Sequence, residues 1–366
     1  MIALLIWYGI VGILFSIFSF GFVDPNFPIL QNTWLTHIVY QKLYIAALVY
    51  TFLIFLLFFL YARILFEKTA FSFRKYALFL FCIGLIFFLS YPALSHDIFN
   101  YILTAKVAYF YRENPYVVMP TELLFEPMLQ FTRAANKLAL YGPIWILGTW
   151  IPHVLSFGNV LVSIYTFKLF VISAYVMVGI LIYRMTKNVR NVLFFVLNPL
   201  VIIETFVSGH NDTFMMALVL YGIYLWRNSQ LAVRIMGWGF MIASVLVKGA
   251  TIVVLPLFVF FRHLSDEKRA LLAGMCMFGV FLLTPLREEM YPWYAIWFLV
   301  FVSLLPMGKR SFLQGAAYML SFGLMLRYVP WIATREYGGT GPLIRTLVTW
   351  IPPMMYTVWY TFSLKR

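Results

Sequence analysis

Acidic side chains are scarce in this sequence, and Asp97 is the one best placed to do chemistry. The 366 residues include only 13 Asp and Glu, and Asp97 follows Ser95 and His96 at the end of an apolar run. A carboxylate at the edge of an apolar medium is partly desolvated, which raises its basicity and suits it to accept a proton from a hydroxyl. Asp97 is therefore the candidate general base, with His96 beside it as a substrate contact. The alternative is that Asp97 only caps the helix that follows.

A second polar cluster, residues 209–212, separates two apolar runs. Gly, Asn and Asp are also the usual residues of tight turns, so a purely structural turn is the alternative here. The functional interpretation is that three side chains of this cluster bind substrate: His210, Asn211 and Asp212. We favour it because the cluster is predicted on the same side of the membrane as Asp97.

Several cations lie outside the basic loops, in or near apolar runs. They are Lys168, Lys248, Arg287, Arg327, Arg335 and Arg345. Such a cation needs a counter-anion or a water-filled cavity. Glu204 or Asp212 would supply the anion structurally, and a phosphate would supply it functionally. Lys248, Arg287 and Arg335 are the predicted phosphate contacts.

The aromatic block Tyr291–Trp297 is typical of a membrane–water interface. In the alternative interpretation its rings, Tyr294 among them, stack on a sugar or line a lipid groove. Metal binding has weaker support, although six groups are predicted on one side: His96, Asp97, His210, Asp212, Glu288 and Glu289. No pair of them has a diagnostic metal spacing, so no metal ligand is assigned, and a divalent cation stays an open possibility.

The composition explains what kind of fold must position these residues. With 63% hydrophobic and 11% charged residues and a mean hydropathy of +0.89, the chain is too apolar for a water-soluble globule. A β-barrel is excluded because its strands would alternate apolar and polar residues. Cys82 and Cys276 lie in apolar runs and suggest no disulfide framework. The sequence predicts one all-α integral-membrane domain over residues 1–366.

About twelve apolar runs approach the ~20 residues that a membrane-spanning helix needs. They are Ile2–Phe20, Ile45–Phe66, Leu78–Ala93, Val160–Tyr183, Val192–Ser208, Phe214–Trp226, Val233–Val247, Ala250–Phe261, Ala270–Leu286, Trp293–Met307, Ser311–Pro330 and Leu347–Leu364. The two runs that flank Lys248 are short for two crossings, so a tilted hairpin and a single bent helix are both open. We favour the hairpin.

The net charge of +14 follows from topology and gives no sign of nucleic-acid binding. The short loops of one predicted side carry most of the cations, namely Arg63, Lys68, Arg74, Lys75, Arg184, Lys187, Arg190, Arg227, Arg234, Arg262, Lys268, Arg269, Lys309, Arg310, Lys365 and Arg366. Basic residues collect in cytoplasmic loops. We therefore expect both termini to be cytoplasmic and Asp97 to be extracytoplasmic.

The longest loop, residues 94–159, lies on the predicted extracytoplasmic side. Its apolar residues from Ile98 to Tyr111 fit the stripe of a helix that lies along the membrane interface. The stretch Tyr141–Phe157 is apolar but contains Pro143 and Pro152, which suits an interfacial or re-entrant helix. The loop is expected to cover a cavity above the membrane-spanning helices.

Several motifs taken together resemble a known superfamily. In order they read "SHDIFNYI", "ENPYVV", "YGPIW", "NPLVIIETFVSGHND", "VLVKGATIVVLPLFVFF" and "YPWYAIWFL". From Ser95 to Trp297 the chain resembles multi-pass glycosyltransferases of the C-type superfamily, in particular the bacterial and archaeal polyprenol-phosphate-mannose-dependent mannosyltransferases. Two extra apolar runs precede the Asp97 loop, but an even number of crossings preserves its side of the membrane.

The resemblance implies an inverting transfer of a sugar, mannose in this subfamily, from a polyprenyl-phosphate carrier to a lipid or glycan acceptor outside the cell membrane. Asp97 would be the base, and Tyr141 of the third motif would contact substrate. No nucleic acid is expected as a partner, whereas membrane lipids are. The alternative function is a transporter or flippase whose path is marked by charges in the apolar runs, such as Lys168 and Glu204.

Overall fold

The computed structural model describes residues 1–27, 34–67, 73–308, 311–336 and 341–363. Every regular element in these ranges is helical. The α-helices are α1 (Ile2–Ser19), α2 (Trp34–Gln41), α3 (Leu43–Phe66), α4 (Phe73–Phe88), α5 (Asp97–Tyr109), α6 (Pro143–Leu155), α7 (Val160–Thr186), α8 (Val189–Val196), α9 (Pro199–Ile202), α10 (Asp212–Trp226), α11 (Leu231–Val245), α12 (Leu255–Phe260), α13 (Asp266–Leu283), α14 (Ile296–Val302), α15 (Phe312–Leu326), α16 (Tyr328–Thr334) and α17 (Gly341–Ser363). Shorter turns of 3₁₀ or π type are η1 (Phe20–Phe22), η2 (Pro120–Glu122), η3 (Pro127–Gln130), η4 (Ile203–Val207), η5 (Gly249–Val254), η6 (Thr284–Leu286) and η7 (Pro292–Ala295). The all-α prediction is confirmed for the described residues.

Four helices of the described ranges are long and apolar enough to cross a membrane, over Ile2–Phe22, Leu43–Phe66, Val160–Thr186 and Asp266–Leu286. A fifth candidate is the pair Val189–Val196 and Pro199–Val207, which bends by 55° and has the form of a broken span or a re-entrant loop. The bend occurs where Pro199 lacks a backbone N–H and Asn198 caps the new helix by accepting from the amide of Leu200. Most of the remaining expected crossings are shorter apolar helices, and α17, although 23 residues long, is not among the candidate spans. The number twelve therefore stays a prediction.

Helix α3 shows why these helices suit a membrane. One face is buried in the protein, with Tyr50 and Ile54 fully covered. The opposite face exposes Leu48, Phe52 and Phe55, each more than half exposed. A helix that is apolar all round belongs in a protein core or a bilayer, and an exposed apolar face fits the bilayer.

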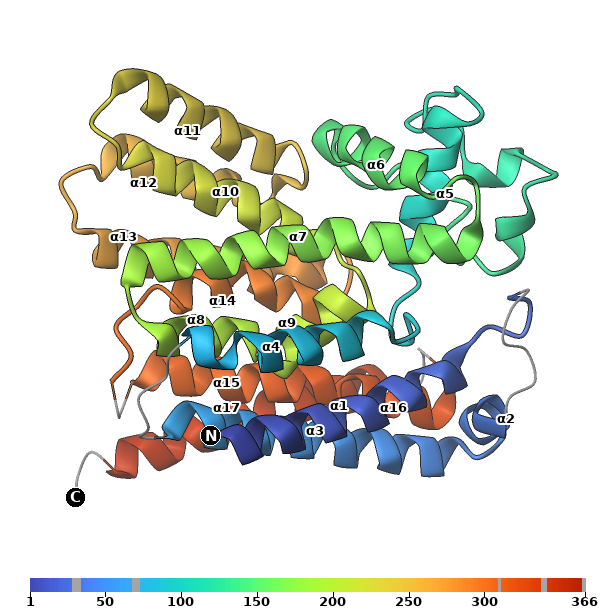
Figure 1. Ribbon diagram of the computed structural model, residues 1–366, viewed down its shortest axis with the longest axis horizontal. Helices are drawn as coiled ribbons and strands as arrows, with labels where there is room; N and C mark the ends of the chain where they lie inside the picture. Colours follow the sequence, from blue (N-terminus) through green and yellow to red (C-terminus); the bar gives the residue numbers. More distant parts are fainter. Residues whose placement is uncertain (28–33, 68–72, 309–310, 337–340, 364–366) are drawn as a thin grey trace.

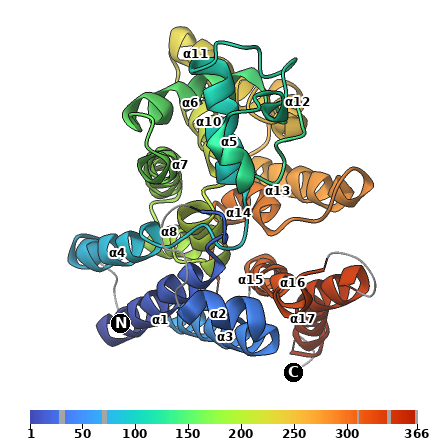
Figure 2. The same cartoon turned by 90° about the vertical axis from the view of Figure 1, so that its right-hand side faces the viewer.

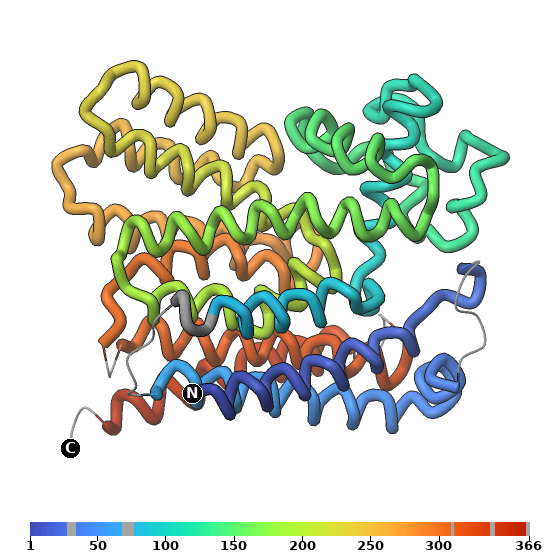
Figure 3. Tube along the Cα trace, viewed as in Figure 1, coloured from blue at the N-terminus to red at the C-terminus, as the bar shows by residue number. Residues whose placement is uncertain are grey.

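The chain runs back and forth between two ends of one helical bundle (Figures 1 and 3). The turns α7–α8, α10–α11 and α12–α13 lie at one end, and α2 and α5 lie at the other. Lys187, Arg227 and Arg262 belong to those turns, so these described basic loops gather at the end opposite Asp97. The predicted basic residues Lys68, Lys309, Arg310, Lys365 and Arg366, and Leu364 of the last predicted run, lie outside the described residues.

The long loop 94–159 places α5 across one end of the bundle (Figure 2). A partly buried ion pair of 2.5 Å between Lys106 and Glu126 holds the connecting segment against α5. Helix α6 runs alongside α7 (Figure 1). Its 13 residues span about 20 Å at 1.5 Å per residue, which is less than the ~30 Å of a hydrocarbon core. This length fits the predicted non-spanning helix.

The region of Lys248 forms a hairpin, as favoured from the sequence. Helix α11 ends at Val245, and η5 with α12 then returns beside it (Figure 1). Lys248 lies in the turn with extended backbone angles. The hairpin therefore presents this cation at the end of the bundle where α5 lies.

Candidate functional site

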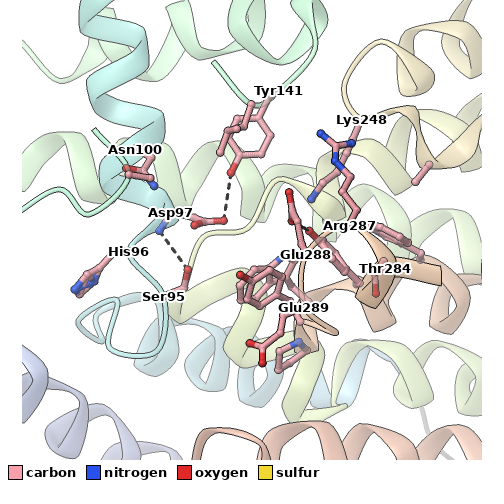
Figure 4. Close-up of a pocket in the computed structure, with 18 of the residues that line it drawn as sticks. Ser95, His96, Asp97, Asn100, Tyr141, Lys248, Thr284, Arg287, Glu288 and Glu289 are labelled. Atoms are coloured by element: carbon pink, nitrogen blue, oxygen red, sulfur yellow. Dashed lines mark hydrogen bonds between the residues drawn. The ribbon is translucent and has the colours of Figure 1, made fainter. Parts of the chain in front are cut away.

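A cavity of about 910 Å³ lies beneath α5. Its wall includes Ser95–Asp97 at the start of α5, Tyr141 before α6, Lys248 in the α11–η5 turn, and Arg287–Glu289 after η6. Figure 4 shows Asp97 on one side of this space and Lys248 and Arg287 on the other. Segments from distant parts of the sequence thus converge on one site.

Asp97 is the first residue of α5, and its side chain is 26% exposed. Its Oδ2 accepts a hydrogen bond from the Tyr141 hydroxyl at 3.3 Å and lies 3.5 Å from Nδ1 of His210. The N-cap position belongs to His96, whose side chain makes no capping hydrogen bond, and the Asp97 amide donates to the Ser95 hydroxyl at 3.2 Å. The alternative that Asp97 only caps the helix is therefore wrong. Its carboxylate points from the wall into the cavity (Figure 4).

Burial raises the pKa of Asp97, but contact with His210, the charge of Lys248 and the Tyr141 hydroxyl outweigh burial and lower the pKa below its usual value. Asp97 is therefore an anion at neutral pH, as a proton acceptor must be. Burial, with the charge of Arg133, lowers the pKa of His96 to about 4. His96 is therefore neutral and available only for hydrogen bonding.

The cluster 209–212 lies behind the cavity wall. His210, Asn211 and Asp212 are all fully buried, and none of them lines the cavity. Direct contact of these three side chains with a substrate, as expected from the sequence, does not fit this burial. Gly209 makes the turn with a φ of +72°, and the Asn211 and Asp212 side chains do not cap α10.

Asp212 instead binds Lys248. Its Oδ1 lies 3.0 Å from the Lys248 ammonium and accepts a hydrogen bond from the Trp297 indole at 2.6 Å. The same ammonium lies 4.6 Å from the ring centre of Tyr294 and within 6 Å of the rings of Tyr141 and Trp297. Cation–π contacts of this kind stabilise a partly desolvated cation. Lys248 is thus held on the wall, with 20% of its side chain exposed.

Gly142 sets the distance between Tyr141 and Lys248. Its amide donates to the carbonyl of Val247 at 2.9 Å, and a Cβ at this position would lie 2.0 Å from the carbonyl oxygen of Leu246. Only glycine allows the two backbones to approach this closely. The "YGP" motif therefore joins the loop before α6 to the turn that carries Lys248.

Positive charge dominates the cavity wall. The cations are Arg133, Lys137, Lys248, Arg287, Arg327 and Arg345, and the acids are Asp97, Glu288 and Glu289. Glu289 is shared by two guanidinium groups, at 3.3 Å from Arg327 and 3.1 Å from Arg345. One carboxylate cannot neutralise both. The described wall therefore keeps an excess of cations that suits an anionic ligand such as a phosphate.

The structure thus brings six of the predicted residues to the cavity: Asp97, His96, Tyr141, Lys248, Arg287 and Tyr294. Arg335 lies elsewhere, because its guanidinium donates to the carbonyl of Val39 and packs on the rings of Phe22 and Trp331. Lys168 is also away from the wall, since its ammonium donates to the carbonyls of Phe88 and Ser90.

Sequence reasoning missed three sets of contacts that shape the site. Tyr328 lines the cavity and donates to Glu204 at 2.9 Å. Trp293 stacks on His210 with ring centres 3.9 Å apart, and Glu289 joins the two arginines. The sequence did hold one indication of Tyr328 and Trp293, because Glu204 and His210 in an apolar environment need partners, and these two residues are their partners in the structure. Within the described residues, no group of three or more His, Cys, Asp or Glu side chains is arranged to hold a metal ion.

Comparison with known proteins agrees with this chemistry. No curated protein and no solved structure matches the chain significantly. Residues 6–263, more than half of the chain, match the family described as alpha-(1->6)-mannopyranosyltransferase, N-terminal domain. The matched range includes Asp97, Tyr141, His210 and Lys248. The chain therefore belongs to this mannopyranosyltransferase family and is a membrane glycosyltransferase of the C type.

Proposed function

We propose that the protein transfers mannose from a polyprenyl-phosphate carrier to a hydroxyl of a lipid or glycan acceptor, with inversion at the anomeric carbon. The observation that carries this proposal is the cavity itself, where one carboxylate, Asp97, faces a wall with excess cations. A base for the acceptor and a cationic site for a leaving phosphate are the two groups that this reaction needs.

In the proposed reaction the acceptor hydroxyl attacks the anomeric carbon of the donor. As the new carbon–oxygen bond forms, Asp97 accepts the hydroxyl proton. The bond from the anomeric carbon to the phosphate oxygen breaks, and its electron pair stays on the phosphate. Lys248 and Arg287 stabilise the charge that develops there. The family description specifies an alpha linkage, so inversion requires a beta-linked donor.

The proposed topology has about twelve crossings, both termini in the cytoplasm and the cavity on the extracytoplasmic side of the cell membrane. The distribution of basic loops supports this sidedness, because Lys187, Arg227 and Arg262 lie at the end opposite α5. A lipid-linked donor fits such a site, since its chain can stay in the bilayer while the phosphate reaches the cavity.

The test is sugar transfer by purified protein in lipid nanodiscs. Radiolabelled mannose is supplied either as beta-linked mannosyl phosphopolyprenol or as a nucleotide-linked sugar, with a mannosyl lipid or oligomannoside as acceptor. We expect transfer only from the polyprenyl phosphate, with an alpha-linked product by NMR. Transfer from the nucleotide sugar alone, or a beta-linked product from the beta-linked donor, would contradict the proposed donor or the inversion.

A further inference from the structure

The imidazole of His210 lies between two carboxylates. Its Nδ1 is 3.5 Å from Oδ2 of Asp97, and its Nε2 is 3.3 Å from Oε2 of Glu204. Ionised carboxylates only accept hydrogen bonds, so both ring nitrogens can be satisfied only if both carry a proton. Neither ring nitrogen forms a hydrogen bond at these distances, but each faces one carboxylate. The arrangement therefore favours an imidazolium with two counter-anions, one on the cavity and one fully buried.

The local backbone is arranged to hold this group. Glu204 lies in the π-helical turn η4, a rare backbone geometry that is frequent at functional sites. The amide of His210 donates to the Glu204 carbonyl at 3.0 Å. Trp293 covers the imidazole face, and the Tyr328 hydroxyl donates to Glu204 Oε1 at 2.9 Å. Each group of the series Asp97, His210, Glu204 and Tyr328 is thus fixed by the next.

We propose that His210 is a positioning residue, kept charged by Glu204, that fixes Asp97 as a carboxylate facing the cavity. This inference rests on the proposed function, because it concerns how the proposed base is held ready. The buried pair does not touch the substrate, and its effect reaches the reaction only through Asp97.

The charge state of the pair also depends on its surroundings. Other titratable or charged side chains lie around the pair and Asp97. They include Tyr50, His96, Tyr101, Tyr141, Lys168, Asp212, Lys248, Tyr294 and Tyr328. Asp212 and Lys248 are paired with each other, and Lys168 is bound to backbone carbonyls. Glu204 and Asp97 are therefore the anions that contact His210.

The sign of each pH effect follows from these contacts. His210 lies between Val207, where the bent pair ends, and Asp212, where α10 begins, and so it is outside both helical segments. Burial lowers its pKa, but contacts with Asp97 and Glu204 outweigh burial and raise it to about 9. Without Glu204 the His210 pKa falls, so the imidazolium is lost at lower pH. Without His210 the Asp97 pKa rises, so the carboxylate is lost earlier as the pH falls.

The experiment measures kcat against pH for the purified enzyme and for Glu204→Gln and His210→Gln. In Glu204→Gln the alkaline limb of the kcat–pH profile should move to lower pH by about 1 to 3 pH units. In His210→Gln the acid limb of the profile should move to higher pH by a similar amount. Glu126→Gln is the matched control, because it removes a buried carboxylate that pairs with Lys106 outside the cavity. Both limbs should stay in place in this variant.

A second measurement leaves Asp97, His210 and Glu204 unsubstituted. NMR of ¹⁵N-histidine in a variant that keeps only His210 of the five histidines should show both ring nitrogens protonated at pH 7.5. A neutral ring at this pH, or lower kcat with unmoved limbs in both site variants, would overturn the proposal. Absence of mannosyl transfer by the wild-type enzyme would instead reject the proposed function, and the NMR result would still decide the charge of His210.

Discussion

Replacement of Asp97 by Asn is the most direct test of the proposed base. The amide keeps the size of the side chain and one oxygen for the Tyr141 hydroxyl, but it does not accept the proton of the acceptor. General-base catalysis contributes about 10²- to 10⁴-fold, which corresponds to about 2.7 to 5.4 kcal/mol of transition-state stabilisation. We expect kcat to fall by at least ~10²-fold while donor KM changes little.

Stability should hardly change, because His210 keeps Glu204 as a counter-anion and the 26% exposed Asp97 side chain loses only one ion pair. The cost should be about 1 kcal/mol or less. The assay is single-turnover transfer of labelled mannose, with thermal unfolding measured in parallel. Glu288→Gln is the matched comparison, because Glu288 is a second carboxylate on the wall and accepts from Tyr294 at 3.0 Å. Near-normal turnover in Asp97→Asn, or a larger loss in Glu288→Gln, would refute the reasoning.

Three further predictions follow from the contacts of the wall. Lys248→Met leaves Asp212 buried without its counter-ion, so this variant should lose about 3 kcal/mol of stability. In the double variant Lys248→Met/Asp212→Asn, calorimetry should show recovered stability while the donor KM stays at least tenfold above that of the wild type. A normal donor KM would assign the phosphate to the arginines. Gly142→Ala should cost about 1 to 3 kcal/mol and most of the transfer activity because its Cβ meets the Leu246 carbonyl, whereas Gly249→Ala, which meets nothing within 4 Å, should leave the unfolding temperature almost unchanged. A membrane-impermeant thiol reagent applied to intact cells should label Lys137→Cys but not Lys187→Cys, and the reverse pattern would invert the proposed topology.

The sequence was sufficient for the helices because hydropathy acts locally. The predicted run Val160–Tyr183 corresponds to α7, Val160–Thr186, and Ile45–Phe66 corresponds to α3, Leu43–Phe66. Asp97 and Lys248 could also be predicted as site residues from the sequence, since each is a charged residue at the end of an apolar run. A charge at that position must reach water or a partner, and this requirement can be read without knowledge of the fold.

The partners of these charged residues could not be predicted from the sequence, because they depend on how the helices pack. Asp212 pairs with Lys248 and His210 with Asp97, although the first pair is 36 residues apart and the second 113. Spacing alone allowed all three buried residues of the 209–212 cluster to face a substrate. In the structure His210 instead faces Glu204, which lies in the π-helical turn η4, a turn with no simple sequence signature.

The pairing of buried charges explains how one cavity combines a base with a cationic surface. An ammonium and a carboxylate left side by side on the wall would attract each other and neutralise the groups that the reaction needs. Instead Asp97 is directed to His210 and Tyr141, and Lys248 to Asp212 and the aromatic rings. Each of the two wall residues is thus bound by a buried partner of opposite charge, so that Asp97 and Lys248 do not pair with each other. The wall can then present a carboxylate to a hydroxyl and cations to a phosphate within the same cavity.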